Sequence, residues 1–276
     1  MIIGFGYLAT RALPHLSQVA EVTGVSRHQE RVSDDAHERI YGDYSSVEGL
    51  TEAAKTQPDY LIFTPVPSSR DVTGYSQGYA RAAQNIADAG LLRGVRRAIF
   101  VSSTRVYAEK SGGWVEEDSP LAAGDPFVDA LLSAEACFRR SVTTTVVRPS
   151  GLYDGANPIM LQPILEGNSS SMNEGFTNRI HRNDAAAVIA ELVKRDIGGE
   201  RLPTTLNLND DAPVTTRELE EWCFSMLGRE PLGERDNQPR ANRRVSNAKL
   251  RAMGVSLRYP SFREGYEGAL SLAASS

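Results

Sequence analysis

Short apolar segments alternate with longer amphipathic ones along the first 210 residues. The apolar segments are rich in β-branched residues, which is typical of strands buried on both faces of a parallel sheet. The intervening segments place apolar residues at helical spacing. We therefore predict an α/β fold, a doubly wound parallel sheet of Rossmann type. The predicted strands are 1–3, 21–25, 59–64, 97–102, 144–148 and 205–208, and the predicted helices are 7–16, 46–55, 79–89, 126–140 and 184–194.

Two parts of the chain depart from this alternation. Residues 156–180 are rich in Gly, Asn, Ser and Pro, and the tail beyond residue 211 carries a predicted helix of its own at 216–227. We expect these parts to form a small C-terminal substrate lobe. The predicted organisation is a dinucleotide-binding Rossmann core of residues 1–155, to which residues 182–210 return, and a lobe of residues 156–181 and 211–276.

Composition narrows the classes of function. The formal net charge of −5 argues against a nucleic-acid-binding protein, which normally carries a basic face. No apolar run is long enough for a membrane span, and no basic segment followed by an apolar one opens the chain. Two cysteines are too few for a disulfide framework, and no cluster has the spacing of a metal site. We expect a cytoplasmic protein with a small-molecule substrate and no metal, nucleic-acid or membrane partner.

A glycine fingerprint stands between the first predicted strand and helix. Gly4-Phe5-Gly6-Tyr7-Leu8-Ala9 matches the pattern Gly-x-Gly-x-x-Gly/Ala. In this pattern the first glycine permits a tight turn and the second lets the backbone approach a pyrophosphate at the helix N-terminus. The alternative is an ordinary glycine-rich turn. The context favours a dinucleotide site that includes Gly4, Gly6, Tyr7 and Leu8.

The ends of the second and third strands suggest which dinucleotide binds. Ser26 and Arg27 stand where an NAD-selective site has an acid. A guanidinium would pair with a 2′-phosphate, so we predict NADP as the preferred cofactor over NAD, the alternative being a solvated Arg27. Asp43 and Tyr44 either flank the adenine or form a plain turn. Thr64 follows the third strand and is predicted to line the crevice.

Several motifs, in their order and spacing, resemble the extended short-chain dehydrogenases/reductases, the NAD(P)-dependent epimerase/dehydratase group, and most of all its atypical members. They are Val101-Ser102-Ser103-Thr104-Arg105-Val106-Tyr107, Glu117-Asp118-Ser119-Pro120, Arg148-Pro149-Ser150-Gly151-Leu152-Tyr153 and Ile180-His181-Arg182-Asn183-Asp184.

The resemblance implies roles for particular residues. Ser103 falls on the catalytic hydroxyl of the family, and Tyr107 is a second catalytic candidate, although in the family that tyrosine usually supports the fold. The residues implied at the cofactor are Ser102, Arg148 and Pro149, and those implied at the substrate are Thr104, Arg179, His181, Arg182 and Arg243. His181 has a structural role as its alternative, and Arg243 a place in a solvated basic loop. Relatives that pair through helices near 79–89 and 126–140 imply a homodimer.

The chain lacks the Tyr-x-x-x-Lys pair with which the family transfers protons. No tyrosine stands between residues 107 and 153, and no lysine between residues 110 and 194. Phe127 or Asp125 falls near the tyrosine position, and Leu131 or Asp129 near the lysine position. An aspartate could act as a base if burial raised its pKa.

Two functions therefore stay open. One is an NAD(P)-dependent oxidoreductase or epimerase acting on a hydroxyl or carbonyl group, including that of a nucleotide sugar. The other is a non-catalytic NADP(H)-binding sensor or regulatory protein, and a third, weaker interpretation is a scaffold with an inactive cofactor site. The missing pair favours a sensor, whereas the retained Ser103 favours an enzyme.

Overall fold

The computed structural model describes residues 1–28, 30, 32–155, 161–169, 174–234 and 242–274. Contacts divide the chain into two compact units. The first unit comprises residues 1–106, 121–148 and 185–206, and the second comprises residues 107–120, 149–184 and 207–276. Residues 107–120, which the sequence analysis assigned to the Rossmann core, thus group with the second unit.

The centre of the fold is a seven-stranded parallel sheet with the strand order β12-β7-β5-β4-β1-β2-β3. This order runs outward in both directions from β1 and β4, which is the doubly wound arrangement predicted from the sequence and confirmed here. The strands are β1 (Ile2–Ile3), β2 (Thr23–Ser26), β3 (Glu38–Tyr41), β4 (Tyr60–Phe63), β5 (Arg97–Val101), β7 (Thr144–Pro149) and β12 (Thr205–Leu208).

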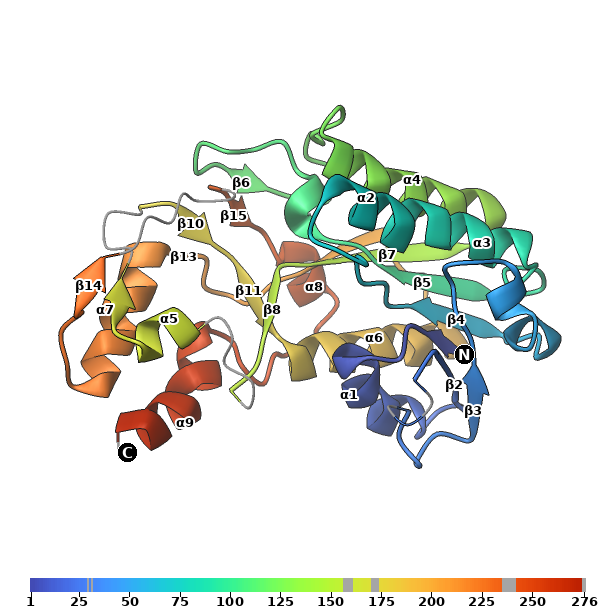
Figure 1. The fold of residues 1–276 in the computed structure, drawn as a ribbon, viewed down its shortest axis with the longest axis horizontal. Helices are drawn as coiled ribbons and strands as arrows, with labels where there is room; N and C mark the ends of the chain where they lie inside the picture. Colours follow the sequence, from blue (N-terminus) through green and yellow to red (C-terminus); the bar gives the residue numbers. More distant parts are fainter. Residues whose placement is uncertain (29, 31, 156–160, 170–173, 235–241, 275–276) are drawn as a thin grey trace. The chain divides into compact units, whose positions relative to one another are not determined.

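Helices cover both faces of this sheet. Figure 1 shows α2, α3 and α4 on one face and α1 and α6 on the other. Their bounds are α1 (Tyr7–Leu16), α2 (Val72–Tyr75), the π-helical turn η4 (Ser76–Arg81), α3 (Ala82–Asp88), α4 (Pro126–Ser141) and α6 (Arg182–Ile197); single 3₁₀ turns are η2 (Glu48–Leu50), η3 (Ala53–Lys55) and η5 (Thr104–Val106). Because both faces are covered, the central strands β1, β4 and β5 carry consecutive buried apolar residues rather than an alternating pattern.

In the first unit, one strand was not predicted and one predicted helix is wrong. The edge strand β3 was not predicted, because its residues are mostly exposed and it shows no apolar run. The helix predicted at 46–55 is instead the pair of 3₁₀ turns η2 and η3. A Cβ on Gly49 would lie on the backbone of Asp43, so the chain packs closely there and does not form a continuous helix.

The helix predicted at 79–89 begins earlier and is irregular. It starts with α2 at Val72 and passes through the π-helical turn η4 before α3. Gly78, in that turn, lies against the backbone of Val66 and Pro67, and a Cβ there would stand 2.6 Å from the Val66 carbonyl oxygen. A π turn commonly marks a place where the helix adjusts to a local constraint, here the loop after β4.

The second unit has short strands and its own apolar core. The core gathers large side chains such as Tyr153, Phe224 and Phe262. The strands are β6 (Trp114–Val115), β8 (Gly151–Tyr153), β9 (Asn168–Ser169), β10 (Phe176–Thr177), β11 (Arg179–His181), β13 (Val214–Thr215), β14 (Gly233–Glu234) and β15 (Arg244–Val245); the helices are α5 (Gln162–Leu165), α7 (Thr216–Leu227), α8 (Ala248–Ala252) and α9 (Phe262–Ala274). Helix α7 has the bounds predicted from the sequence.

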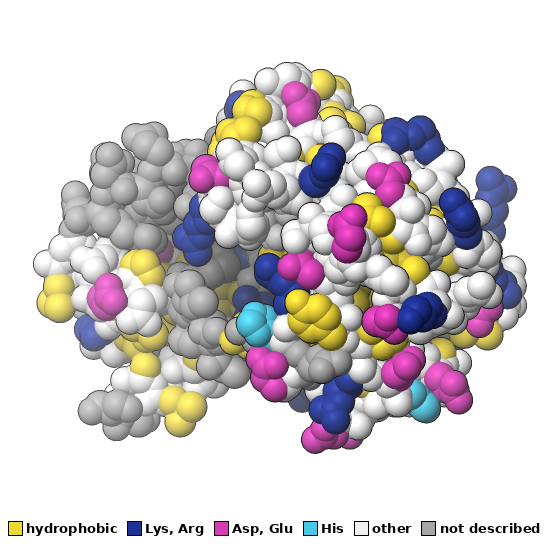
Figure 2. Space-filling view, turned by 45° about the vertical axis from the view of Figure 1, so that its right-hand side comes forward, with side chains coloured by type: hydrophobic (Ala, Val, Ile, Leu, Met, Phe, Trp, Pro, Cys, Tyr) yellow, Lys and Arg dark blue, Asp and Glu magenta, His cyan; other side chains and the backbone are white. Residues whose placement is uncertain are grey.

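One face of the molecule carries charges of both signs. On the face drawn in Figure 2, basic and acidic side chains are interspersed, and apolar ones form small separate groups. Within the described part of the chain, no helix is long and apolar enough to cross a membrane, and no group of Cys, His, Asp and Glu is arranged to hold a metal ion.

Candidate functional site

The glycine turn after β1 is locked to the end of β4. Gly4 has a φ of +86°, and a Cβ on it would stand 2.5 Å from the Thr64 carbonyl oxygen. The Thr64 hydroxyl donates to the Gly4 carbonyl at 2.6 Å, and the Thr64 N–H donates to the Ile3 carbonyl at 3.0 Å. Only glycine fits this backbone and this space. The predicted residues Gly4 and Thr64 therefore lie together at the carboxyl edge of the sheet.

The N-terminus of α1 is open. Gly6 precedes the helix, no side chain caps it, and the first turn holds no acidic residue. A Cβ on Gly6 would have its nearest neighbour 3.9 Å away, and Tyr7 is exposed while Leu8 is buried. A helix start of this kind presents partial positive charge that favours an anion. This geometry suits the pyrophosphate of a dinucleotide.

The end of β2 carries a loose ion pair. Nη1 of Arg27 lies 3.9 Å from Oδ2 of Asp43, and about half of the Arg27 side chain is exposed. The Ser26 hydroxyl accepts the N–H of His28 at 3.1 Å. The structure thus brings Arg27 and Asp43 together, which the sequence analysis treated separately. The long, exposed pair leaves the guanidinium accessible.

Tyr44 packs into the first unit. Its ring stands edge-on to Phe63, with the centroids 5.3 Å apart, and its carbonyl accepts the Asn85 amide at 3.0 Å. Burial is the main cause that raises the pKa of the Tyr44 phenol. The proposed place of Tyr44 beside an adenine stays a prediction.

A buried network joins β5, α4 and β7. The Ser102 hydroxyl donates to Glu135 at 2.7 Å, and Arg148 donates to both oxygens of the same carboxylate at 3.1 and 2.8 Å. All three side chains are buried, as is Pro149 at the end of β7. Sequence reasoning missed Glu135, although an acid among the buried positions of α4 was a signal that it needs a partner. The network holds α4 against the sheet, and contact of these residues with a cofactor stays a prediction.

Ser103 and Thr104 follow β5 and are partly exposed. The Ser103 hydroxyl accepts the N–H of Arg105 at 3.1 Å. The Arg105 guanidinium lies 4.3 Å from the Phe127 ring centroid and 5.2 Å from that of Tyr75. Phe127 is one of the two residues expected near the tyrosine position of the family, and its contact with Arg105 was not predicted.

The first turns of α4 hold no free acid–base pair. The Asp125 carboxylate caps the helix, accepting the N–H groups of Phe127 and Val128 at 2.9 and 3.3 Å. Asp129 accepts the N–H of Gly124 at 3.0 Å. Leu131, near the lysine position, is fully buried. Both aspartates thus have structural hydrogen bonds, and neither is placed as a desolvated base.

In the second unit, Tyr107 is an internal residue. It is 0% exposed, and its hydroxyl donates to Oδ1 of Asn207 at 2.6 Å. Arg243, also buried, donates to the Tyr107 carbonyl. These contacts favour the supporting role of Tyr107 over a catalytic one, because the phenol is closed off from solvent, and they place Arg243 inside this unit rather than in a solvated loop.

The remaining predicted substrate residues are also packed within the second unit. His181 stacks on Tyr259, with ring centroids 3.8 Å apart, and Arg182 donates to Asp154 at 3.0 Å. Arg179 is buried beside Asp210. Burial raises the pKa of the Asp210 carboxyl to about 7, although Arg179 opposes the shift. These surroundings support the structural alternative for His181, and substrate contact by the arginines stays a prediction.

Comparison with known proteins agrees with this geometry. The profile of the NAD(P)H-binding family matches residues 4–196, which include the glycine turn, Arg27 and Ser103. No match was found among curated protein sequences.

Solved structures share the fold over the whole chain. A protein of Methylobacillus flagellatus assigned to the NAD-dependent epimerases/dehydratases is 27% identical, with a TM-score of 0.80 over 100% of this chain and 98% of that one. The UDP-glucose 4-epimerase of Thermus thermophilus, solved with NAD, is 18% identical, with a TM-score of 0.79 over 99% and 97%. The human epimerase family protein SDR39U1, solved with NADPH, is 18% identical, with a TM-score of 0.73 over 99% and 98%. The resemblance to the epimerase/dehydratase group inferred from the motifs is thereby confirmed.

Proposed function

The chain belongs to the NAD(P)H-binding family, and we propose that it is an NADP(H)-dependent oxidoreductase or epimerase acting on a hydroxyl or carbonyl group. The observation that carries the proposal is the common edge of three strands. Ile3, Phe63 and Phe100 are in register in β1, β4 and β5. The glycine turn, Thr64 and the partly exposed Ser103 follow these strands and so lie at the carboxyl edge, where doubly wound folds bind their ligands.

The choice of NADP over NAD rests on Arg27. Its side chain is about half exposed, and among the described residues its one ion pair is the 3.9 Å contact with Asp43. A 2′-phosphate would offer it a charge-assisted, two-oxygen contact that a bare ribose does not. Asp43 would neutralise part of the positive charge of Arg27. At 3.9 Å it leaves the guanidinium able to bind the 2′-phosphate as well.

The proposed chemistry keeps one part of the family's machinery. A nicotinamide cofactor supplies or accepts a hydride. Ser103 would hydrogen-bond the substrate oxygen and hold it in place. Phe127 and Leu131 carry no titratable group, so the proton would be exchanged with water or with a group on the substrate rather than with a Tyr–Lys pair.

The proposed substrate is a compound with a hydroxyl or carbonyl group. A nucleotide sugar would need cationic side chains free for its diphosphate. Arg182 pairs with Asp154 and Arg179 is buried, so these residues give that narrower class little support.

The free, buried thiols of Cys137 and Cys223 support a reducing compartment such as the cytoplasm. A homodimer through α3 and α4 is proposed by analogy alone.

Cofactor binding is tested by fluorescence titration with NADPH and, separately, NADH. We expect NADPH to bind more tightly, and Arg27→Ala to weaken NADPH at least about tenfold while NADH changes little, because only NADPH has the 2′-phosphate. Arg93→Ala removes an exposed arginine outside the site and serves as the control. Failure of both cofactors to bind would refute the proposal.

Turnover is tested by screening carbonyl compounds for oxidation of NADPH. We expect Ser103→Ala to lower kcat/KM at least about a hundredfold with unchanged NADPH binding, because it removes the hydroxyl that orients the substrate oxygen. Ser133→Ala, at an exposed position of α4, is the matched control. Tight NADPH binding with no turnover in any screen would instead support the non-catalytic sensor.

A further inference from the structure

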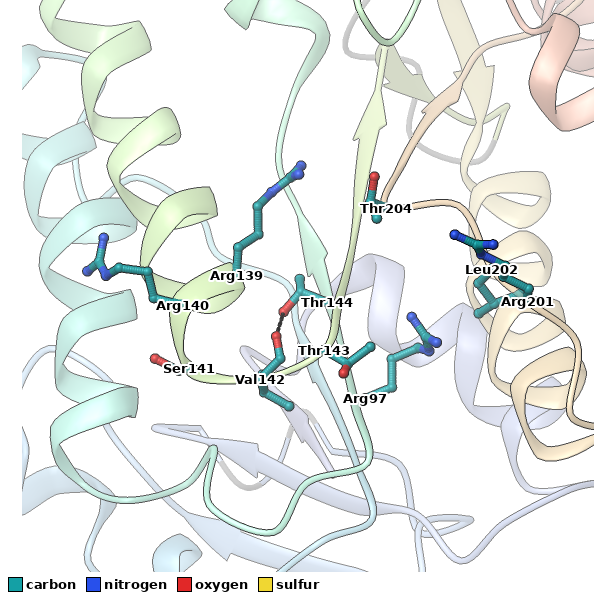
Figure 3. A pocket seen from close by; sticks show the side chains of 10 residues that line it. All are labelled: Arg97, Arg139, Arg140, Ser141, Val142, Thr143, Thr144, Arg201, Leu202 and Thr204. Carbon is teal, nitrogen blue, oxygen red and sulfur yellow. Dashed lines mark hydrogen bonds between the residues drawn. The ribbon is translucent and has the colours of Figure 1, made fainter.

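A pocket lies in the first unit, at the edge of the sheet opposite the glycine turn. It has a volume of about 620 Å³. Figure 3 shows the side chains around it, which come from the start of β5, the end of α4, the turn into β7 and the segment before β12. Arg97 and Thr144 are the first residues of β5 and β7. Because the strands are parallel, the pocket lies at their amino ends, opposite the glycine turn.

The charge of this pocket is of one sign. Arg97, Arg139, Arg140 and Arg201 line it, and none of the described residues in its lining is acidic. Two acids that do not line the pocket partly neutralise two of these arginines. Arg97 pairs with Asp196 at 2.7 Å, and Arg139 lies 3.7 Å from Glu135.

Both of these acids serve other arginines as well. Asp196 also pairs with Arg96 at 2.9 Å, and Glu135 also pairs with Arg148 at 2.8 Å. Each carboxylate is therefore shared between two guanidinium groups. The positive charge around the pocket exceeds what these two acids can neutralise.

Arg140 and Arg201 are the uncommitted cations. Both are exposed, and within the described residues neither has a hydrogen bond or ion pair with another side chain. The C-terminal carbonyl groups of α4 contribute roughly half a negative charge near Arg140. That partial charge is too small to balance two whole cations. The hydroxyls of Thr143 and Thr204 add neutral hydrogen-bonding groups to the lining.

We propose that this pocket is an anion site that binds a small phosphate-bearing metabolite. Its volume lies in the range of small-molecule pockets, roughly 300–1,000 Å³. Guanidinium groups bind phosphate oxygens in pairs, and the lining carries such groups on α4, on β5 and before β12. The apolar side chains of Val142 and Leu202 could contact the non-phosphate part of the ligand. The site is separate from the dinucleotide site and does not depend on the proposed function.

The test is isothermal titration of the full chain with inorganic pyrophosphate, with and without saturating NADPH. The double variant Arg140→Ala/Arg201→Ala removes the two uncommitted cations. Its matched control, Arg81→Ala/Lys110→Ala, removes the same charge from two exposed side chains that line neither site. With NADPH saturating the glycine turn, we expect one bound pyrophosphate per chain, a Kd raised at least about tenfold in the first variant, and an unchanged Kd in the control.

Three results would overturn the proposal. Equal weakening in both double variants would mean diffuse attraction to surface charge. Competition between pyrophosphate and NADPH, with no effect of the arginine variants, would place the anion at the glycine turn. Absence of any pyrophosphate binding would refute an anion site directly. Since NADPH binding is measured on the same samples, failure of the dinucleotide site is distinguished from failure of the pocket.

Discussion

Two helices of the first unit begin in opposite ways. Helix α1 starts at a glycine, its first turn has no acidic residue, and among the described residues no side chain caps it. Helix α4 starts at Asp125, whose carboxylate caps two N–H groups, and its first turn includes Asp129. The start of α1 is left for an outside anion, whereas the start of α4 is completed by the chain itself. In the proposed function, the cofactor therefore binds at the start of α1, and the start of α4 takes no part in that binding.

The strongest challenge to this comparison is to restore the missing pair. We expect Leu131→Lys to destabilise the protein by about 4 kcal/mol or more, because it buries an unpaired ammonium at a fully buried position. Phe127→Tyr should change the free energy of unfolding by only about 0.5 kcal/mol, since that ring is partly exposed. Urea unfolding measures both. If the Leu131→Lys variant were as stable as the original chain, packing would not be what excludes the pair.

The second test concerns the turn before α1. Gly4→Ala should weaken NADPH at least about a hundredfold, because its Cβ meets the Thr64 carbonyl and the turn must move. Gly94→Ala is the control, because Gly94 also has a positive φ, +75°, but open space around it. Titration with NADPH, alongside thermal melts to establish folding, measures the effect. Equal NADPH affinity in the two variants would contradict the proposed role of the turn.

A third test makes the start of α1 resemble that of α4. Gly6→Asp should add a cap worth a few tenths of a kcal/mol but weaken NADPH at least about tenfold, because its carboxylate would repel the pyrophosphate. Gly6→Asn has nearly the same shape and no charge, so it should weaken NADPH less. If the two variants bind NADPH equally, the electrostatic argument fails and only space matters.

The smallest effect is expected at α4 itself. Asp125→Ala removes the cap and should cost about 1 kcal/mol of stability, with NADPH binding unchanged. Asp118 provides a control outside any helix, because Asp118→Ala should stay within about 0.5 kcal/mol. Thermal unfolding separates the two. A loss of NADPH affinity in the Asp125→Ala variant would show that the two helix starts are not independent.

The sequence predicted those elements whose conformation is determined by residues close together in the chain. Helix α1 and strand β12 have the predicted bounds, since apolar spacing sets them, and the fingerprint at Gly4 predicted a turn whose positive φ and close packing require glycine. Strand β3 escaped prediction because pairing with β2, rather than an apolar pattern, makes it a strand. The meeting of Arg27 with Asp43 depends on the fold. No spacing rule brings such residues together.

The first residues of the loop after β4 are held at two places. The hydroxyl of Thr64 holds one end to the Gly4 carbonyl, and Gly78 of the π-helical turn packs against the backbone of Val66 and Pro67. A dinucleotide arriving at this edge meets a rim that is already ordered, so association carries little entropic cost for arranging it. Binding should then follow a single kinetic phase whose rate rises in proportion to cofactor concentration, with no slower step for loop closure.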